Sequence, residues 1–147
     1  NYLNQEWVRE QLHATGKPWT LCDEPSPYFG VLADHDLDGA KLLGALLPRV
    51  HVLAVSGFYD VVANHEGTAA WLANVPFAGQ QLFQQARNSS YQVDARPAGY
   101  WRGAAGLAHA VIFNAGHNIA FDQPQAMQQL VFDFIDGKLT PPPPRKW

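Results

Sequence analysis

The feature that most constrains the fold of this chain is a strand, turn and helix pattern toward its C-terminal end. The run Val111–Phe113 is apolar, as in a buried strand, and it stops at Ala115-Gly116, where small residues let the backbone turn sharply. Pro124 then suits the first position of a helix. His117 lies on the turn, so we expect rigid structure on both sides of a ring that stays free to move protons.

The same pattern occurs upstream, where a second apolar run is followed by a carboxylate. Val50–Val55 is rich in valine, Gly57 allows a turn, and Asp60 comes next. Parallel strands place their carboxyl ends at one edge of a sheet, so Asp60 and His117 are expected to meet there if the two strands run parallel. A carboxylate that orients an imidazole is part of a Ser-His-Asp triad, and acid before histidine is the α/β-hydrolase order. The alternative is a loop histidine without chemistry.

The remaining periodicity predicts an α/β fold with few strands. Strands at 98–102 and 107–113 should flank a hairpin turn at 103–106, and Gly137 should end a helix over 125–136. Because a parallel strand needs neighbours on both sides, the missing strands are expected to come from elsewhere. The apolar face of the last helix is expected to contain Met127, Leu130, Val131, Phe134 and Ile135. Further helices are expected at 4–14, with Asn4 as the cap, and at 37–47, 65–75 and 79–87.

Composition and charge argue against several function classes. The 147 residues are 47% hydrophobic and 16% charged, which allows a substantial core in one domain. A net charge of −3 without a basic stripe argues against nucleic-acid binding. No apolar run approaches the ~20 residues of a membrane-spanning helix, so no membrane partner is expected.

Metal ions and cofactors are not expected either. The stretch Asp34–Gly39 resembles the start of a calcium loop, but Lys41 stands where an apolar residue is needed and Ala45 where a glutamate is needed. We therefore interpret its acids as part of a solvated turn, and zinc-type HExxH spacing is absent. Two other histidines are interpreted without chemistry, His65 as solvent-facing and His109 as a packing residue.

Four short motifs, taken in order, point to one enzyme family. They are Tyr2-Leu3-Asn4 with Leu12-His13-Ala14, Ser56-Gly57 with Asp60, Ala98-Gly99-Tyr100, and Ala115-Gly116-His117 with Asp122-Gln123-Pro124. On these residues the chain resembles the serine carboxypeptidases, the peptidase branch of the α/β-hydrolases. Phe77-Ala78-Gly79 is most similar to the vitellogenic-like branch. The chain departs from the family pattern at Asn118, where methionine is usual, and at Ala120, where proline is usual.

The resemblance implies the C-terminal half of an α/β-hydrolase fold, completed by a partner chain. Residues 1–147 would form the C-terminal portion of a single α/β-hydrolase domain, with a proline-rich tail at 140–147. None of the chain's four serines lies in the family's Gly-x-Ser-x-Gly nucleophile motif; they are Ser26, Ser56, Ser89 and Ser90. The implied enzyme releases C-terminal residues from peptides. Its small chain would supply the catalytic Asp60 and His117, and a large chain of the same precursor the serine.

Further assignments follow from the same resemblance. Asn118 would line the leaving-group pocket and contact the peptide substrate, because the residue after the histidine does so in the family. Cys22, the only cysteine, would form an interchain disulfide with the large chain. Asn88 begins a glycosylation sequon, which suits a protein of the secretory pathway that is secreted or resides in a lysosome or vacuole. A dimer of two-chain units is left open.

Two alternatives remain at this stage. Acyltransferases and hydroxynitrile lyases share the fold, and a fold does not choose among chemistries. An inactive or structural relative could also have kept the scaffold, which the departures at Asn118 and Ala120 would tolerate. A nucleophilic serine on the partner chain would favour an enzyme, and its loss would favour the structural alternative.

Overall fold

The computed structural model describes residues 2–21 and 39–139. The chain divides into two compact units, Asn1–Asp38 and Gly39–Trp147, which are described separately. Cys22, the acidic turn and the proline-rich tail lie outside the described residues, so the predictions made for them stay predictions.

The N-terminal unit contains a 3-10 turn, Tyr2–Asn4, followed by the short helix α1, Glu6–Gln11. The prediction that Asn4 caps this helix is wrong. Gln5 occupies the N-cap position, and its side chain makes no capping hydrogen bond. The Asn4 amide instead donates to the Trp19 carbonyl at 2.8 Å, and its oxygen accepts the Trp19 N–H at 2.7 Å. Asn4 therefore fastens the following loop to the start of the helix.

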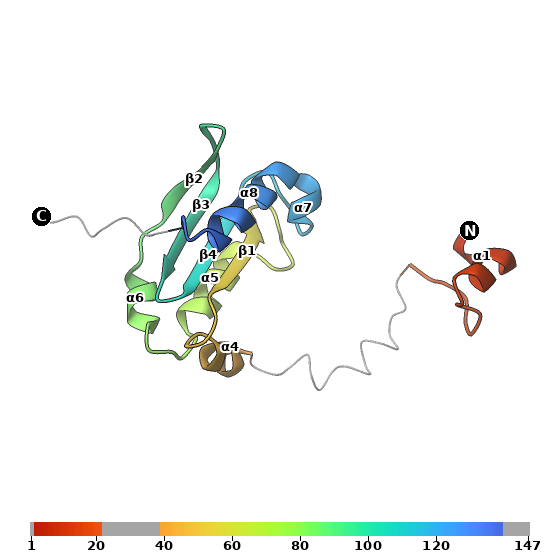
Figure 1. Ribbon diagram of the computed structural model, residues 1–147, viewed down its shortest axis with the longest axis horizontal. Helices are drawn as coiled ribbons and strands as arrows, with labels where there is room; N and C mark the ends of the chain where they lie inside the picture. The colour runs from red at the N-terminus through yellow and green to blue at the C-terminus, as the bar shows by residue number, and fades with distance from the viewer. Residues whose placement is uncertain (1, 22–38, 140–147) are drawn as a thin grey trace, which may run out of the picture. The chain divides into compact units, whose positions relative to one another are not determined.

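The larger unit is built on a four-stranded sheet in the order β1-β4-β3-β2 (Figure 1). β1 runs parallel to β4, whereas β4, β3 and β2 pair antiparallel to one another. Among the described residues, β1 pairs with a neighbour on one side only. The strand bounds are Val52–Gly57 for β1, Ser89–Val93 for β2, Arg96–Ala104 for β3 and Leu107–Ile112 for β4.

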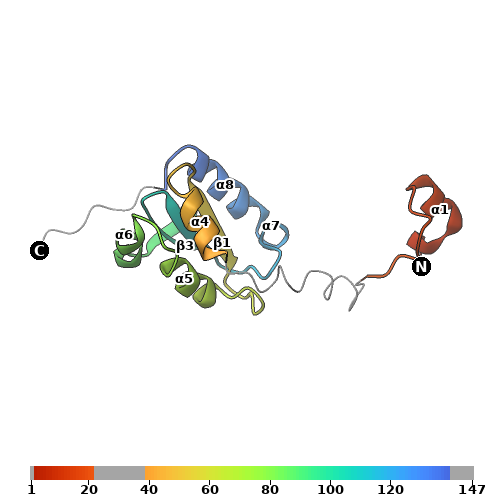
Figure 2. The ribbon, with the colours of Figure 1, turned by 90° about the horizontal axis from the view of Figure 1, so that it is seen from below.

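Helices cover both faces of this sheet, with α8 on one side and α5 and α6 on the other (Figure 2). No helix in the described part of the chain has the length and apolar character to cross a membrane. The helix bounds are Ala40–Leu46 for α4, His65–Ala73 for α5, Gln80–Gln85 for α6, Ile119–Asp122 for α7 and Pro124–Ile135 for α8.

Strand β4 lies between two apolar cores, and all six of its residues are buried. Ala110 and Ile112 pack with Leu130 beneath α8, whereas Leu107 packs with Phe83 on the other side. This double burial explains why five of the six residues of β4 are apolar, with His109 as the exception, as is typical of a strand covered on both faces.

Strand β2 was not predicted, because its hairpin lacks the usual glycine signal. The turn between β2 and β3 is Asp94-Ala95, with φ of 50° and 59°. The next turn is Ala105-Gly106, with φ of 51° and 87°, so β3 continues through Ala104 rather than ending before 103 as predicted. Two consecutive positive φ angles suit the twist of a two-residue hairpin. Such a turn is hard to recognise in a sequence when it lacks glycine and asparagine.

Helix α8 begins at Pro124, and Gly137 follows its end with φ of +69°, both as the sequence predicted. The buried face of the helix includes Leu130 and also Ala126, which the apolar pattern did not single out. Ile135 is 71% exposed, so the prediction that it belongs to the packed apolar face is wrong. Ile135 is the last residue of the helix.

Candidate active site

Asp60 and His117 lie in two loops at the same end of the sheet. Asp60 follows β1 and His117 follows β4, and these strands are parallel neighbours, so their carboxyl ends open side by side. The loop after β1 and helix α7 meet at this end (Figure 1).

The backbones of the two loops are tied together closely. The N–H of Tyr59 donates to the carbonyl of Ala115 at 2.9 Å. At Gly57 an added Cβ would lie 2.1 Å from the carbonyl oxygen of Gly116, which no side chain tolerates. Glycine at this position is therefore required by the close approach of the second loop, and the approach sets how near the two side chains come.

The Asp60 carboxylate joins the imidazole of His117. Its Oδ2 lies 2.9 Å from Nδ1 of His117, and its Oδ1 accepts the N–H groups of Val62 at 2.9 Å and Ala63 at 3.0 Å. Asp60 is 8% exposed, whereas the His117 side chain is 72% exposed. The carboxylate is thus fixed by its own loop, and the ring projects from the sheet edge toward open space.

These contacts set the charge of the pair. The N–H of Ala63 contributes most to holding the pKa of Asp60 below its ordinary value, and His117 and the N–H of Val62 add to this against the opposing effect of burial. Asp60 is therefore ionised at neutral and mildly acidic pH. A carboxylate that accepts the Nδ1 proton leaves Nε2 as the basic nitrogen, so His117 can take a proton there while Asp60 stabilises the resulting cation.

The loop that carries His117 is fastened from the helix side. Asp122 Oδ2 accepts the N–H of Gly116 at 2.7 Å, and the Gln123 amide donates to the carbonyl of Asn114 at 3.2 Å. Asn114 has φ of 55°, a left-handed conformation that asparagine tolerates better than most residues. Sequence reasoning placed Asp122 and Gln123 at a helix start and in a family motif, and their role in holding this loop is seen only in the loop geometry.

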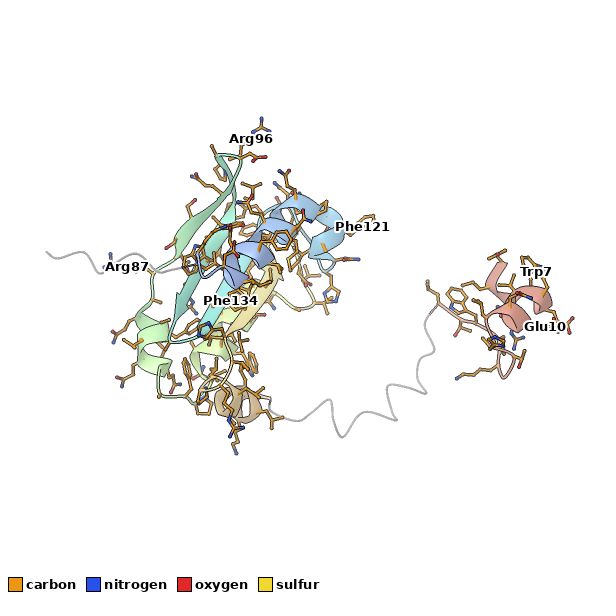
Figure 3. All side chains as sticks on the ribbon, viewed as in Figure 1. Trp7, Glu10, Arg87, Arg96, Phe121 and Phe134 are labelled. Atoms are coloured by element: carbon orange, nitrogen blue, oxygen red, sulfur yellow. The ribbon has the colours of Figure 1, made fainter. Side chains whose placement is uncertain are left out.

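Asn118 follows the histidine and is exposed at the N-terminal end of α7, where its side chain makes no capping bond. Phe121 on the same short helix is 81% exposed and projects outward (Figure 3). The amide of Asn118 is therefore available beside His117, and an apolar ring stands one turn away.

An aromatic cluster that sequence reasoning missed supports the Asp60 loop. Phe58 stacks on His65, with ring centroids 5.0 Å apart and planes 15° apart, and meets Phe113 edge-on at 5.5 Å. Nδ1 of His65 is 3.3 Å from the hydroxyl of Tyr100. The prediction that His65 faces solvent is thus wrong, because its ring is held between two aromatic partners. The loop sequence gave no signal for this cluster, because its partners come from β3, from α5 and from the end of β4.

A serine–histidine contact lies inside the sheet, apart from the Asp60–His117 pair. Ser56 Oγ is 3.1 Å from Nε2 of His109, and each residue is 3% exposed. Burial, helped by the charges of Arg102 and His65, lowers the pKa of His109 to about 4. His109 is a packing residue as predicted. Ser56 bonds to this ring, and no serine in the described part of the chain bonds to His117.

The remaining predicted sites are only partly visible. Asn88 is exposed in the segment just before β2, and its glycosylation stays a prediction. Within residues 2–21 and 39–139, no group of three or more histidine, cysteine, aspartate or glutamate side chains is arranged to hold a metal ion.

Comparison with known proteins shows the family and the fold to which this pair belongs. Residues 1–137 match the serine carboxypeptidase family. This chain belongs to the serine carboxypeptidase family. It is similar to serine carboxypeptidase-like 47 of Arabidopsis thaliana, 29% identical over 97% of the chain and 28% of the relative, and to serine carboxypeptidase 3 of Triticum aestivum, 32% identical over 94% and 28%.

A solved structure shows the same fold. A prohormone-processing carboxypeptidase from Saccharomyces cerevisiae matches with a TM-score of 0.70 and 18% sequence identity, over 95% of this chain and 31% of that one. The fold is thus that of the α/β-hydrolases, as the resemblance implied. The chain spans between a quarter and a third of the length of these serine carboxypeptidases.

The vitellogenic-like branch stays a prediction. Vitellogenic carboxypeptidase of Aedes aegypti is 29% identical over 90% of the chain and 28% of the relative, which resembles the values for the plant proteins. The identities therefore give no preference for that branch over the plant carboxypeptidases.

Proposed function

We propose that this chain supplies the acid and the base of a serine carboxypeptidase that releases C-terminal residues from peptides. The observation that carries the proposal is the 2.9 Å contact between Oδ2 of Asp60 and Nδ1 of His117, beyond the carboxyl ends of the parallel strands β1 and β4. Family membership supports the reaction class, since the chain matches serine carboxypeptidases over nearly its whole length.

The chemistry follows from which nitrogen is free. A serine hydroxyl from outside this chain attacks the carbonyl of the last peptide bond, and Nε2 of His117 takes the hydroxyl proton. The imidazolium that forms is stabilised by the ionised Asp60. It then gives the proton to the leaving amine, and water releases the peptide from the serine in a second round of the same proton transfers.

The serine is proposed to belong to a large chain of the same precursor. Two features of the chain support a neighbour at this side of the sheet. The outer edge of β1 pairs with nothing among the described residues, and Val61 and Val62 beside Asp60 are almost fully exposed. Cys22 is proposed to bridge to that large chain, and a dimer of such two-chain units is compatible with the proposal.

Asn118 is proposed to contact the leaving residue of the substrate, because its exposed amide lies next to the base. An amide at this place favours polar C-terminal residues over apolar ones, since its hydrogen-bonding groups would be left unpaired against an apolar side chain. Passage through the secretory pathway, with secretion or delivery to a lysosome or vacuole, and glycosylation at Asn88 complete the proposal.

Turnover of the intact enzyme tests this function. His117→Ala should lower kcat for a blocked dipeptide by roughly 10⁴-fold, because it removes the base, while the thermal midpoint stays near that of the wild type. Asn88→Gln is the matched control, since it changes an exposed polar residue away from the pair and should leave kcat unchanged. A His117→Ala enzyme with wild-type turnover would refute the assignment, and an inactive wild type without a reactive serine would favour the scaffold alternative.

A further inference from the structure

We propose that Phe58 is a positioning residue that holds Asp60 against His117. The inference rests on the proposed function and adds a residue to it. Phe58 lies two positions before Asp60, in the loop that joins β1 to α5, and none of its atoms belongs to the acid–base pair.

Phe58 connects three segments of the chain. Its ring stacks on His65 at the start of α5, and it makes an edge-to-face contact with Phe113 directly after β4. Its own N–H donates to the carbonyl of Ile112 at 2.9 Å. Since Phe113 begins the loop that leads to His117, the ring joins the loop of the acid to the loop of the base. Both contacts depend on ring shape, because stacking and edge-to-face packing each need an aromatic ring.

The stacking partner is itself held in place. The hydroxyl of Tyr100 is 3.3 Å from Nδ1 of His65, and the ring of Tyr100 also packs on Phe113 with centroids 6.0 Å apart. Burial, and secondarily the charge of Glu66, raises the pKa of Tyr100, so its hydroxyl keeps the proton that it can donate to His65. The rings of this cluster therefore hold one another in place, and the position of the Phe58 ring is fixed by its neighbours.

Simple core packing does not account for this ring. Phe58 is 40% exposed and lies outside both apolar cores, so its burial contributes less than that of a core phenylalanine. What its contacts restrain is the segment that carries Asp60. An orientation error of about 1 Å between catalytic groups can cost about 10²-fold in rate, so a residue of this kind affects turnover more than stability.

The test replaces the ring in the intact enzyme. Phe58→Leu keeps an apolar side chain without stacking, and it should lower kcat by about 10- to 100-fold with KM within about twofold of wild type. Phe58→Tyr keeps the ring and should restore most of the turnover. The low-field proton resonance of the Nδ1–H that His117 donates to Asp60 should broaden or vanish in Phe58→Leu and persist in Phe58→Tyr.

Phe83→Leu is the matched structural control. Phe83 is fully buried beneath Arg102 in the core on the α5 side and contacts neither loop, so the change should lower the thermal midpoint and leave kcat and the resonance unchanged. Phe58→Leu with unchanged kcat and resonance would overturn the inference, as would a rise in KM alone, which would make Phe58 a substrate contact. His117→Ala measured alongside separates the two proposals, because its inactivity upholds the function even if Phe58 fails.

Discussion

Two histidines of this carboxypeptidase chain, one on β4 and one just after it, are placed in opposite surroundings. His117 is 72% exposed and contacts the carboxylate of Asp60 at 2.9 Å. His109 is 3% exposed and contacts the hydroxyl of Ser56 at 3.1 Å. Among the described residues only His109 has a serine beside it, whereas only His117 combines a carboxylate partner with open access.

The difference lies in what surrounds each ring. Burial lowers the pKa of His109 to about 4, and the Arg102 charge adds to this, so the imidazolium of a base would be disfavoured there. At His117 an ionised carboxylate faces the ring and the solvent is near. A serine close to a histidine is therefore not enough for nucleophilic catalysis. The histidine also needs a carboxylate partner and a ring that a substrate can reach.

Removing the acid should have the largest effect on this contrast. Asp60→Asn keeps the shape of the side chain but favours the wrong tautomer of His117, so kcat should fall by roughly 10⁴-fold at unchanged KM. Steady-state kinetics of the intact enzyme with a blocked dipeptide measures kcat and KM of this variant. A loss of less than about tenfold would mean that His117 works without Asp60.

The buried His109 should affect the pH dependence of the unfolding free energy rather than turnover. Between the ordinary histidine pKa near 6.5 and the folded value of about 4, the unfolded chain binds the proton and the folded chain does not. Stability should therefore fall as pH drops through this window, by at most about 3 kcal/mol, and level off below it. Urea unfolding at several pH values should show a flatter dependence in His109→Gln; an identical dependence would contradict the low pKa.

The smallest effect is expected at the buried serine. Ser56→Ala removes one internal hydrogen bond, so it should cost about 1 kcal/mol of unfolding free energy and change kcat by less than about twofold. Parallel measurements of urea midpoint and kcat check both numbers. A loss of turnover comparable to that of Asp60→Asn would instead make Ser56 part of the chemistry and remove the contrast.

The position of the pair could be predicted from the sequence because its signals are local. A glycine turn after an apolar run places a polar residue at a strand end, and two such runs made Asp60 and His117 neighbours once the strands were taken as parallel. Helix α8 was predictable for the same reason, since Pro124 and Gly137 mark its ends.

What the sequence did not reveal depends on contacts between distant segments. The stacking of Phe58 on His65 and the bond from Asp122 to the His117 loop arise only when strands and loops are assembled. Strand β2 was missed because Asp94-Ala95 adopts a hairpin turn without glycine. Ile135 keeps the helical spacing of the apolar face but is 71% exposed, and periodicity alone does not show where the buried face of a helix ends.

The central claim is that Asp60 and His117 act as one unit, and a double-mutant cycle tests it most directly. Turnover is measured for the intact enzyme, for His117→Ala, for Asp60→Asn and for both changes together. Groups that act as a unit are strongly non-additive, so the double variant should be no more than about threefold slower than His117→Ala alone. A further loss of several orders of magnitude on adding Asp60→Asn to His117→Ala would show that the two residues act independently and would contradict the account.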